Sequence, residues 1–149
     1  MSLEQKIMIE LKTAMLAKDE KTVRSLRAIK AAIINAKTSE GAGGQIQEED
    51  ENKLLQKMVK QRKDSLEIFQ QQNREDLAQK EREELDVIER FLPKQLTADQ
   101  IKEKVKKIIE ETGASSQADF GKVMSAASKQ LAGQADGKMI SAVVKEFLA

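Results

Sequence analysis

The chain has 149 residues, carries a formal net charge of +1 and contains neither cysteine nor histidine. The absence of thiols and imidazoles excludes disulfides, zinc sites built on those ligands, and nucleophilic catalysis by Cys–His or Ser–His–Asp groups. Because 40% of the residues are apolar and 34% are charged, we expect one ordinary domain or two small ones with a heavily charged surface.

The scarcity of aromatic and turn-forming residues indicates an all-α protein. The chain has four Phe, no Tyr, no Trp and a single Pro, so its core must be aliphatic. Apolar residues recur at helical spacing, and no segment alternates with a period of two. No apolar stretch is long enough for a membrane span or a signal-peptide core. The sequence therefore favours a cytoplasmic protein that does not bind membranes.

Residues 1–93 are predicted to form about four helices arranged as helical hairpins. Ser2 and Gln5 have the spacing of a capping box at the first helix. The apolar stripe of that helix repeats every four residues and consists of Leu3, Ile7, Leu11 and Met15. Asp19 is predicted to cap the second helix, which the glycine-rich loop 39–44 follows. The acidic run 48–51 suits the start of the third helix, and Asn73 is the predicted cap of the fourth.

Pro93, the only proline, marks the predicted boundary between two domains, 1–93 and 94–149. Proline disfavours helical backbone in the residue before it, and Thr97 and Gln100 have the spacing of a second capping box. The second domain is predicted to be a three-helix bundle. Gly113 would end its first helix, its second would span 118–132, and Asp136 would cap its third. Met124 and Phe147 are among the residues predicted to point inward.

The fourth predicted helix is rich in acidic residues, which raises the possibility of a carboxylate pair for acid–base chemistry. Glu81, Glu83 and Glu84 stand among Lys80 and Arg82. Opposite charges three and four residues apart on a helix usually stabilise a solvated face. We therefore expect this stretch to be a solvated face, without a carboxylate metal site.

The overall charge is too small for a protein that coats nucleic acid, so any such binding must use local basic patches. Residues 1–93 contain 17 basic and 18 acidic residues, whereas 94–149 contain nine lysines and seven acids. The densest cluster includes Lys60, Arg62 and Lys63, of which Lys60 and Lys63 share a helical face that suits adjacent phosphates. An ordinary solvated helix flank is the alternative. No aromatic residue interleaves with the cluster, so a base-stacking platform is not expected.

Two glycine–lysine pairs in the last third of the chain are candidate anion sites. Gly121 precedes Lys122, and Gly137 precedes Lys138, each near a predicted helix start. Glycine permits close approach of another backbone or a phosphate, and the free N–H groups of a helix start attract anions. The alternative is a simple helix–turn–helix joint at each position.

These and other segments resemble the GatB/YqeY family over nearly the full length of the chain. The segments that carry the resemblance are Leu26–Ile33, Lys63–Ser65 with Phe69, Arg74–Ala78, Glu81 with Glu84 and Leu85, Phe91–Pro93, Gly121–Met124 and Ala135–Gly137. Each is short, but their order and spacing together are specific. The family pattern has a tyrosine where Phe91 stands and a lysine where Gln134 stands, so this chain carries one phosphate-capable charge fewer.

The resemblance implies an all-helical, two-domain protein whose C-terminal part is similar to the tail domain of the GatB subunit of tRNA-dependent amidotransferases. Those complexes convert misacylated Glu-tRNA or Asp-tRNA to the Gln or Asn form. Their tail helps to hold the tRNA, while the amidase and kinase chemistry lies elsewhere. A label of carbon–nitrogen ligase with glutamine as amido-N-donor would therefore come to this chain by association.

The first hypothesis is a non-catalytic accessory protein that binds tRNA or another structured RNA, without a cofactor or metal. Its candidate contacts are Gly121, Lys122, Lys129, Gly137, Lys138 and Lys145, with Lys60, Arg62 and Lys63 extending the footprint. The alternative is a protein–protein adaptor that docks on a larger enzyme complex, in which Met58, Met124 and Met139 would offer an adaptable apolar contact. Amide transfer by this chain alone is not expected, because it lacks a recognisable amidase nucleophile and a phosphate loop of the Gly-x-x-x-x-Gly-Lys type.

Overall fold

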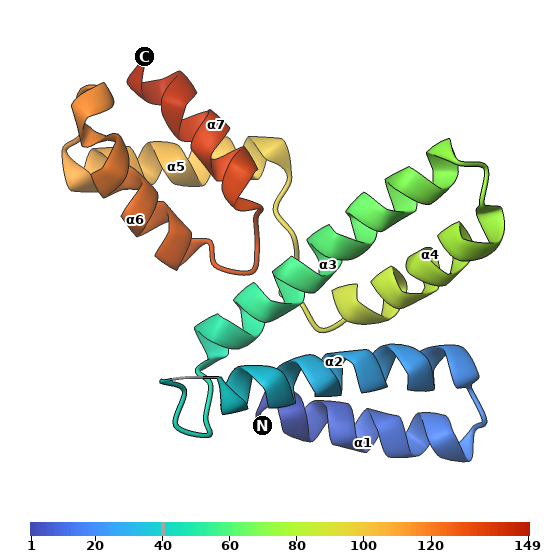
Figure 1. Cartoon of the computed structure of the whole chain (residues 1–149). Coiled ribbons are helices and arrows are strands. Elements are labelled where there is room, and N and C mark those ends of the chain that lie inside the picture. Colours follow the sequence, from blue (N-terminus) through green and yellow to red (C-terminus); the bar gives the residue numbers. More distant parts are fainter. Residues whose placement is uncertain (40) are drawn as a thin grey trace. The chain divides into compact units, whose positions relative to one another are not determined.

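The computed structural model describes residues 1–39 and 41–149 and contains no strand among them (Figure 1). It divides into two units, Met1–Leu92 and Pro93–Ala149. The first unit contains α1 (Leu3–Leu16), α2 (Glu20–Thr38), α3 (Glu48–Gln71) and α4 (Glu75–Glu89). The second contains α5 (Ala98–Thr112), a 3-10 turn (Gln117–Asp119), α6 (Phe120–Gln130) and α7 (Gly137–Leu148). The all-α prediction is confirmed, while the division into the domains 1–93 and 94–149 stays a prediction.

Most helix ends lie where the local sequence predicted them. The Ser2 hydroxyl accepts from the Gln5 N–H (3.2 Å), and the Gln5 side chain accepts from the Ser2 N–H (2.9 Å). Thr97 and Gln100 form the same reciprocal pair at the start of α5. Gly113 ends α5 with a φ of 68°, a conformation that glycine adopts without strain. The two predicted acidic caps also accept backbone hydrogen bonds, namely Asp19 and Asp136.

One predicted helix cap is wrong, and one predicted loop is only partly described by the structure. Asn73 does not cap α4, because Arg74 occupies the cap position and Asn73 takes a left-handed φ of 56° in the turn after α3. Asparagine tolerates that conformation better than most residues. The predicted loop 39–44 includes Glu40, which lies outside the described residues. None of the helices in the described part of the chain is long and apolar enough to cross a membrane.

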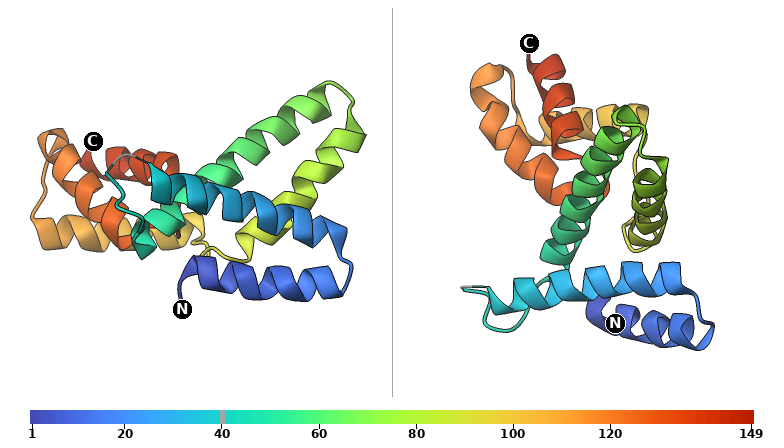
Figure 2. Two further views of the ribbon diagram at one scale, coloured as in Figure 1. Left: turned by 60° about the horizontal axis from the view of Figure 1, so that its bottom comes forward. Right: turned by 45° about the vertical axis from the view of Figure 1, so that its right-hand side comes forward.

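The first unit consists of two helical hairpins, α1–α2 and α3–α4, as both views in Figure 2 show. Helix α2 belongs to the first hairpin and also packs against α3 and α4. The centre of its apolar stripe, Leu26, Ile29 and Ile33, is therefore buried. The largest buried side chains of this core are Ile7, Leu26, Ile29, Ile33, Leu55 and Ile88.

The predicted stripe of α1 is correct for Leu3 and Ile7 but wrong for Met15, whose side chain is 52% exposed. A step of four residues turns an α-helix by about 400°, so a strict four-residue repeat drifts by about 40° per step. After three steps from Leu3 the side chain has left the buried face. Ala14 takes the buried position instead.

A cluster of ion pairs joins α2, α3 and α4, and it contradicts the prediction that the acidic stretch of α4 is only a solvated face. Glu84 accepts from Arg24 Nε of α2 (3.3 Å) and from Arg62 Nε of α3 (3.0 Å). The side chains of Glu84 and Arg62 are 16% and 17% exposed. Glu83 accepts from Arg24 Nη2 at 2.9 Å. These contacts lie between helices, which a pattern within one helix does not predict.

The pKa values in this cluster follow its geometry. The hydrogen bond from Arg24 lowers the pKa of Glu83 below its usual value. Partial burial raises the pKa of Glu81, and the negative charge of Glu84 adds to that effect. The cluster thus contains both a stabilised carboxylate and one that is easier to protonate.

In the second unit, α5, α6 and α7 enclose an aliphatic core around Ile101, Val105, Ile108, Val123, Leu131 and Val144. Leu148 is buried at the end of α7, whereas Phe147, predicted to point inward, is 41% exposed. Phe120 and Met124 pack at the edge of this core. The N–H of Leu96 donates to the carbonyl of Gln134 (2.9 Å), which ties the segment before α5 to the α6–α7 turn.

We expect Glu84→Ala to lower the free energy of unfolding by about 1–3 kcal/mol, because it leaves Arg62 half-buried without its carboxylate. Glu89→Ala is the matched control, since its pair with Lys63 is long (3.9 Å) and exposed. That change should cost less than about 0.5 kcal/mol. Urea denaturation followed by circular dichroism measures both. Equal effects of the two substitutions would contradict a structural role for the cluster.

Candidate nucleic-acid interface

The start of α6 is shaped by Asp119, whose carboxylate accepts from the N–H groups of Ser115 (2.9 Å) and Ser116 (3.4 Å). These bonds close the 3-10 turn Gln117–Asp119, so α6 begins at Phe120, later than the predicted residue 118. The hydrogen bond from Ser115 lowers the pKa of Asp119, and the bond from Ser116 and the charge of Lys122 act in the same direction. The turn thereby sets which face Lys122 presents.

Lys122 and Lys129 line one shallow surface hollow of about 480 Å³ on the outer side of α6. They stand seven residues apart, which is two helical turns and about 10.5 Å along the axis. Lys122 Nζ donates to the carbonyl of Thr112 (3.0 Å), at the C-terminal end of α5, where the helix dipole favours a cation. The other lining residues are Thr112, Ser125, Ala126 and Gln130. Of the described residues that line the hollow, none is acidic, so its charge suits an anion.

Lys138 and Lys145 form a second exposed pair with the same spacing, on α7. The ammonium of Lys145 lies 5.8 Å from the ring centroid of Phe120, the first residue of α6. This contact places Lys145 at the edge where α6 and α7 meet. The backbone N–H of Lys138 donates to Asp136 (3.2 Å). Lys145 thus contacts α6. Among the described residues, Lys138 is not one of those that line the hollow.

The two glycines of the predicted anion sites, Gly121 and Gly137, lie in the first turns of α6 and α7. A Cβ added at either position would meet no atom within 4 Å. No described part of this chain therefore requires glycine there for close packing. Close approach of a phosphate at these two positions stays a prediction.

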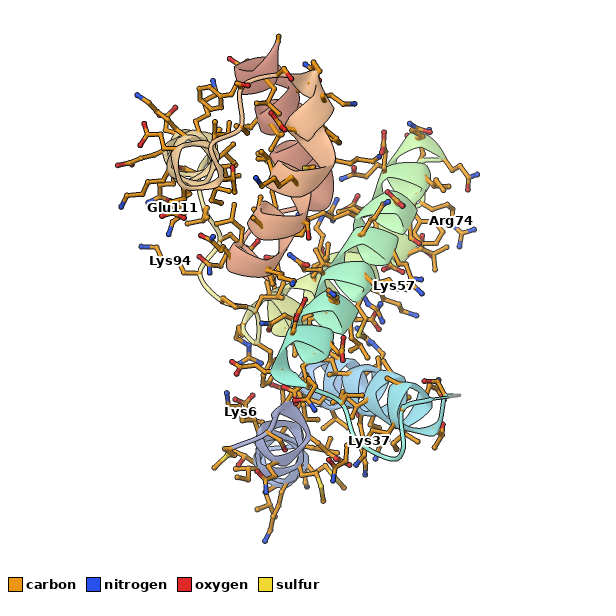
Figure 3. All side chains as sticks on the ribbon, turned by 90° about the vertical axis from the view of Figure 1, so that its left-hand side faces the viewer. Lys6, Lys37, Lys57, Arg74, Lys94 and Glu111 are labelled. Carbon is orange, nitrogen blue, oxygen red and sulfur yellow. The ribbon has the colours of Figure 1, made fainter. Side chains whose placement is uncertain are left out.

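The predicted basic cluster of α3 is divided by the fold. Arg62 is turned toward Glu84 and takes part in the half-buried ion pairs, so its charge serves the fold and not the predicted nucleic-acid footprint. Lys60 and Lys63 are exposed, and Lys63 lies 3.9 Å from Glu89. Lys57, labelled in Figure 3, is exposed on the same helix. Charge density alone did not distinguish structural cations from solvated ones.

Sequence reasoning missed Thr112, Ser125 and Gln130 as lining residues of the hollow. Ser125 and Lys129 lie three and seven residues after Lys122, so helical periodicity could have found Ser125. Thr112 belongs to another helix, and only the packing of α5 on α6 brings it near. Within the described residues, no group of three or more acidic side chains is placed to hold a metal ion. The charge of the hollow suits an anion, and the described residues that line it include no recognisable acid–base pair.

Comparison with known proteins identifies the family of this chain. A family model described as Yqey-like protein matches residues 4–148. The chain belongs to the YqeY-like protein family. The match spans α1 to α7 and confirms the resemblance found in the sequence.

Relatives of this YqeY-like chain carry the name Altered inheritance of mitochondria protein 41, mitochondrial. The protein from Clavispora lusitaniae is 39% identical over 108 residues, 71% of this chain and 62% of its own length. The one from Pyrenophora tritici-repentis is 33% identical over 148 residues, 96% of this chain and 79% of its own length. The one from Lachancea thermotolerans is 36% identical over 83 residues, 44% of its own length. The chain thus spans less than two thirds of two of these relatives.

The prediction of a cytoplasmic location is wrong, because these YqeY-like relatives are named as mitochondrial proteins. It rested on the lack of cysteine and of a long apolar segment. Mitochondrial targeting segments are amphipathic and are removed from the mature protein, so an apolar segment is not their mark. Those two features therefore do not distinguish the compartments.

Asp119→Asn tests whether the negative charge of Asp119 stabilises the turn that precedes α6. Folding lowers the pKa of Asp119 from its ordinary value of 3.8, so the ionised group stabilises the fold above that pH and loses this effect as the pH falls toward the folded value. An amide keeps an acceptor oxygen but has no charge. We expect the variant to melt below the parent at pH 7, and the difference to shrink between about pH 5 and pH 3. A pH-independent difference in melting temperature would refute the ionic contribution.

Proposed function

We propose that this chain is a non-catalytic accessory protein that binds tRNA or another structured RNA through the second unit. The observation that carries the proposal is the pairing of Lys122 and Lys129 in one hollow. Two ammonium groups two turns apart suit contacts with separate phosphates of a folded backbone. Lys145, and Lys138 farther along the same face of α7, would extend the contact. Such contacts respond to the shape of the RNA rather than its base sequence.

The charge of the second unit supports this proposal. Residues 94–149 carry nine lysines and seven acids, a small excess that favours a local contact over general coating of nucleic acid. Lys102 is already paired with Glu146 at 4.0 Å. Apart from the two lysines, the described residues that line the hollow are uncharged, and the nearby Asp119 is held by the N–H groups of Ser115 and Ser116. An RNA phosphate could approach the two lysines without displacing an ion pair.

The resemblance to the tail domain of the GatB subunit supports the choice of RNA. That tail contributes tRNA contacts to an enzyme whose chemistry lies in other parts of the complex. The lack of thiols, of imidazoles and of a recognisable amidase nucleophile agrees with an accessory role for this chain. By this proposal, the amidotransferase relationship is one of ancestry and of RNA binding, without amide transfer by the chain itself.

The test is binding of the full chain to bulk tRNA across a salt series, with duplex DNA as the comparison ligand. We expect tRNA to be preferred and affinity to fall steeply with salt. Lys122→Glu/Lys129→Glu should weaken tRNA binding at least about tenfold and reduce the salt dependence. Lys104→Glu/Lys106→Glu on α5 is the matched control, because it makes the same charge change outside the hollow.

The control variant Lys104→Glu/Lys106→Glu shows whether tRNA binding depends on the hollow or on the net charge of the protein. An equal loss of affinity in both double variants would show that net charge governs binding and would reject the hollow as the site. Absence of tRNA binding by the parent chain at low salt would reject the RNA function itself. Unchanged circular dichroism and melting of both variants must accompany either result, since all four lysines are exposed.

Gly121→Ala should change the free energy of unfolding and the affinity for tRNA in opposite directions. Alanine favours helix, and its Cβ meets no atom of the described chain, so we expect the free energy of unfolding to rise by about 0.5 kcal/mol. If RNA phosphates approach the start of α6, the added methyl group should at the same time weaken tRNA binding. Tighter or unchanged tRNA binding by this stabilised variant would contradict close approach at Gly121.

The adaptor alternative is not supported by the three methionines predicted for it. Met58 is only 7% exposed, Met124 is half-buried and Met139 is 45% exposed. Met58 and Met124 belong to different units and each packs on the core of its own. A different set of methionines, on α1, does form an exposed apolar face.

A further inference from the structure

Helix α1 is apolar on two sides. One side buries Leu3, Ile7 and Ala14. The other side carries Met8 and Met15, which are 53% and 52% exposed. These two methionines stand seven residues apart, so they share one face of the helix at a spacing of about 10.5 Å. The core of the first unit therefore leaves a second apolar stripe of α1 unused.

This stripe lines a shallow groove along α1, to which α2 contributes one residue, Lys30. Its volume is about 420 Å³, and its lining consists of Met8, Leu11, Lys12, Met15, Leu16 and Lys30. Leu16 is the most exposed of the large apolar residues that line it, at 78%. Helices α3 and α4 pack against α2 elsewhere in the same unit. A groove between two antiparallel helices has the shape that receives a third helix.

The charge of the groove selects among possible occupants. Of the described residues that line it, two are lysines, one from each helix, and none is acidic. Lys30 is half-buried, and Arg27, three residues before it on α2, is exposed and extends the same basic edge. A second copy of the chain would bring these cations against their own equivalents across a two-fold axis. The groove therefore favours a partner that is apolar in the middle and acidic at its flanks.

We propose that the α1–α2 groove is a docking site for an amphipathic helix of a protein partner, with acidic residues beside its apolar stripe. Met8, Met15 and Leu16 contact the apolar stripe, and methionine side chains adapt to several shapes of partner. Lys12 and Lys30 pair with the acidic flanks and set the orientation of the helix. This site lies in the first unit and is independent of the RNA contact proposed for the second.

The test uses a defined probe with the full chain. The probe is a fluorescent 18-residue peptide with leucines at helical spacing and glutamates beside them, and its comparison peptide has lysines in place of the glutamates. We expect the acidic peptide to bind and the basic one not to bind, as measured by fluorescence anisotropy. Met8→Gln/Met15→Gln should weaken binding about tenfold or more, while Ile68→Gln, an exposed apolar change on α3, should not.

Charge reversal gives a second, independent readout. Lys12→Glu/Lys30→Glu should transfer the preference from the acidic peptide to the basic one, a gain of binding that misfolding cannot produce. Equal binding of both peptides, or no binding of either, would overturn the proposal.

Two other occupants are tested with the same variants. Binding to phosphatidylcholine vesicles with 30% phosphatidylglycerol, lost in Met8→Gln/Met15→Gln and stronger than peptide binding, would assign the groove to a membrane surface instead. Concentration-dependent self-association of the parent chain, abolished by the same substitutions in sedimentation experiments, would assign it to a second copy. Either result would replace the proposed partner helix.

Discussion

The molecule depends on the burial of narrow aliphatic stripes along helices that are too short to be stable alone. The longest helix, α3, has 24 residues and α6 has only 11, and isolated helices near the lower end of that range are marginal in water. The chain contains no Cys or His that could form a disulfide or a histidine ligand, and its only aromatic residues are four Phe. Each helix must therefore gain its stability from neighbours that cover residues such as Ile29, Ile88 and Val144.

This constraint explains why so much of the surface remains available for binding. A helix that buries one stripe leaves its opposite face to solvent, and the composition of that face is free to vary. On α6 it carries Lys122 and Lys129 around a hollow without acids. On α1 it carries Met8 and Met15 beside Lys12. The two units thus present different chemistry, one suited to a phosphate backbone and the other to an apolar helix with acidic flanks.

The part of the fold that could be predicted is the part governed by local interactions. A capping box needs only residues three apart, so Ser2 with Gln5 and Thr97 with Gln100 identified the starts of α1 and α5. The left-handed turn at Gly113 follows from the same local rules. Aliphatic periodicity identified most of the core, but it failed near helix ends, where Met15 and Phe147 had turned away from the buried face.

The candidate site was less predictable, because its geometry comes from contacts between helices. Lys122 stood out beside Gly121, but the hollow also needs Thr112 from the end of α5. Arg62 looked equivalent to Lys60 in the sequence, yet packing of α3 on α4 directs it to Glu84. Which cations serve the fold and which face solvent is decided by tertiary structure. The location of the relatives likewise could not be inferred from composition.

The most direct test of the RNA-binding account is a titration of the ¹⁵N-labelled full chain with tRNA at low salt, followed by amide chemical shifts. We expect the largest changes to cluster on the outer side of α6, around Lys122 and Lys129, and to continue toward Lys145. The amides of α2 near Arg24 should change little, since that region is held by its own ion pairs. Changes confined to α1–α4, or no changes at all, would contradict the RNA-binding account.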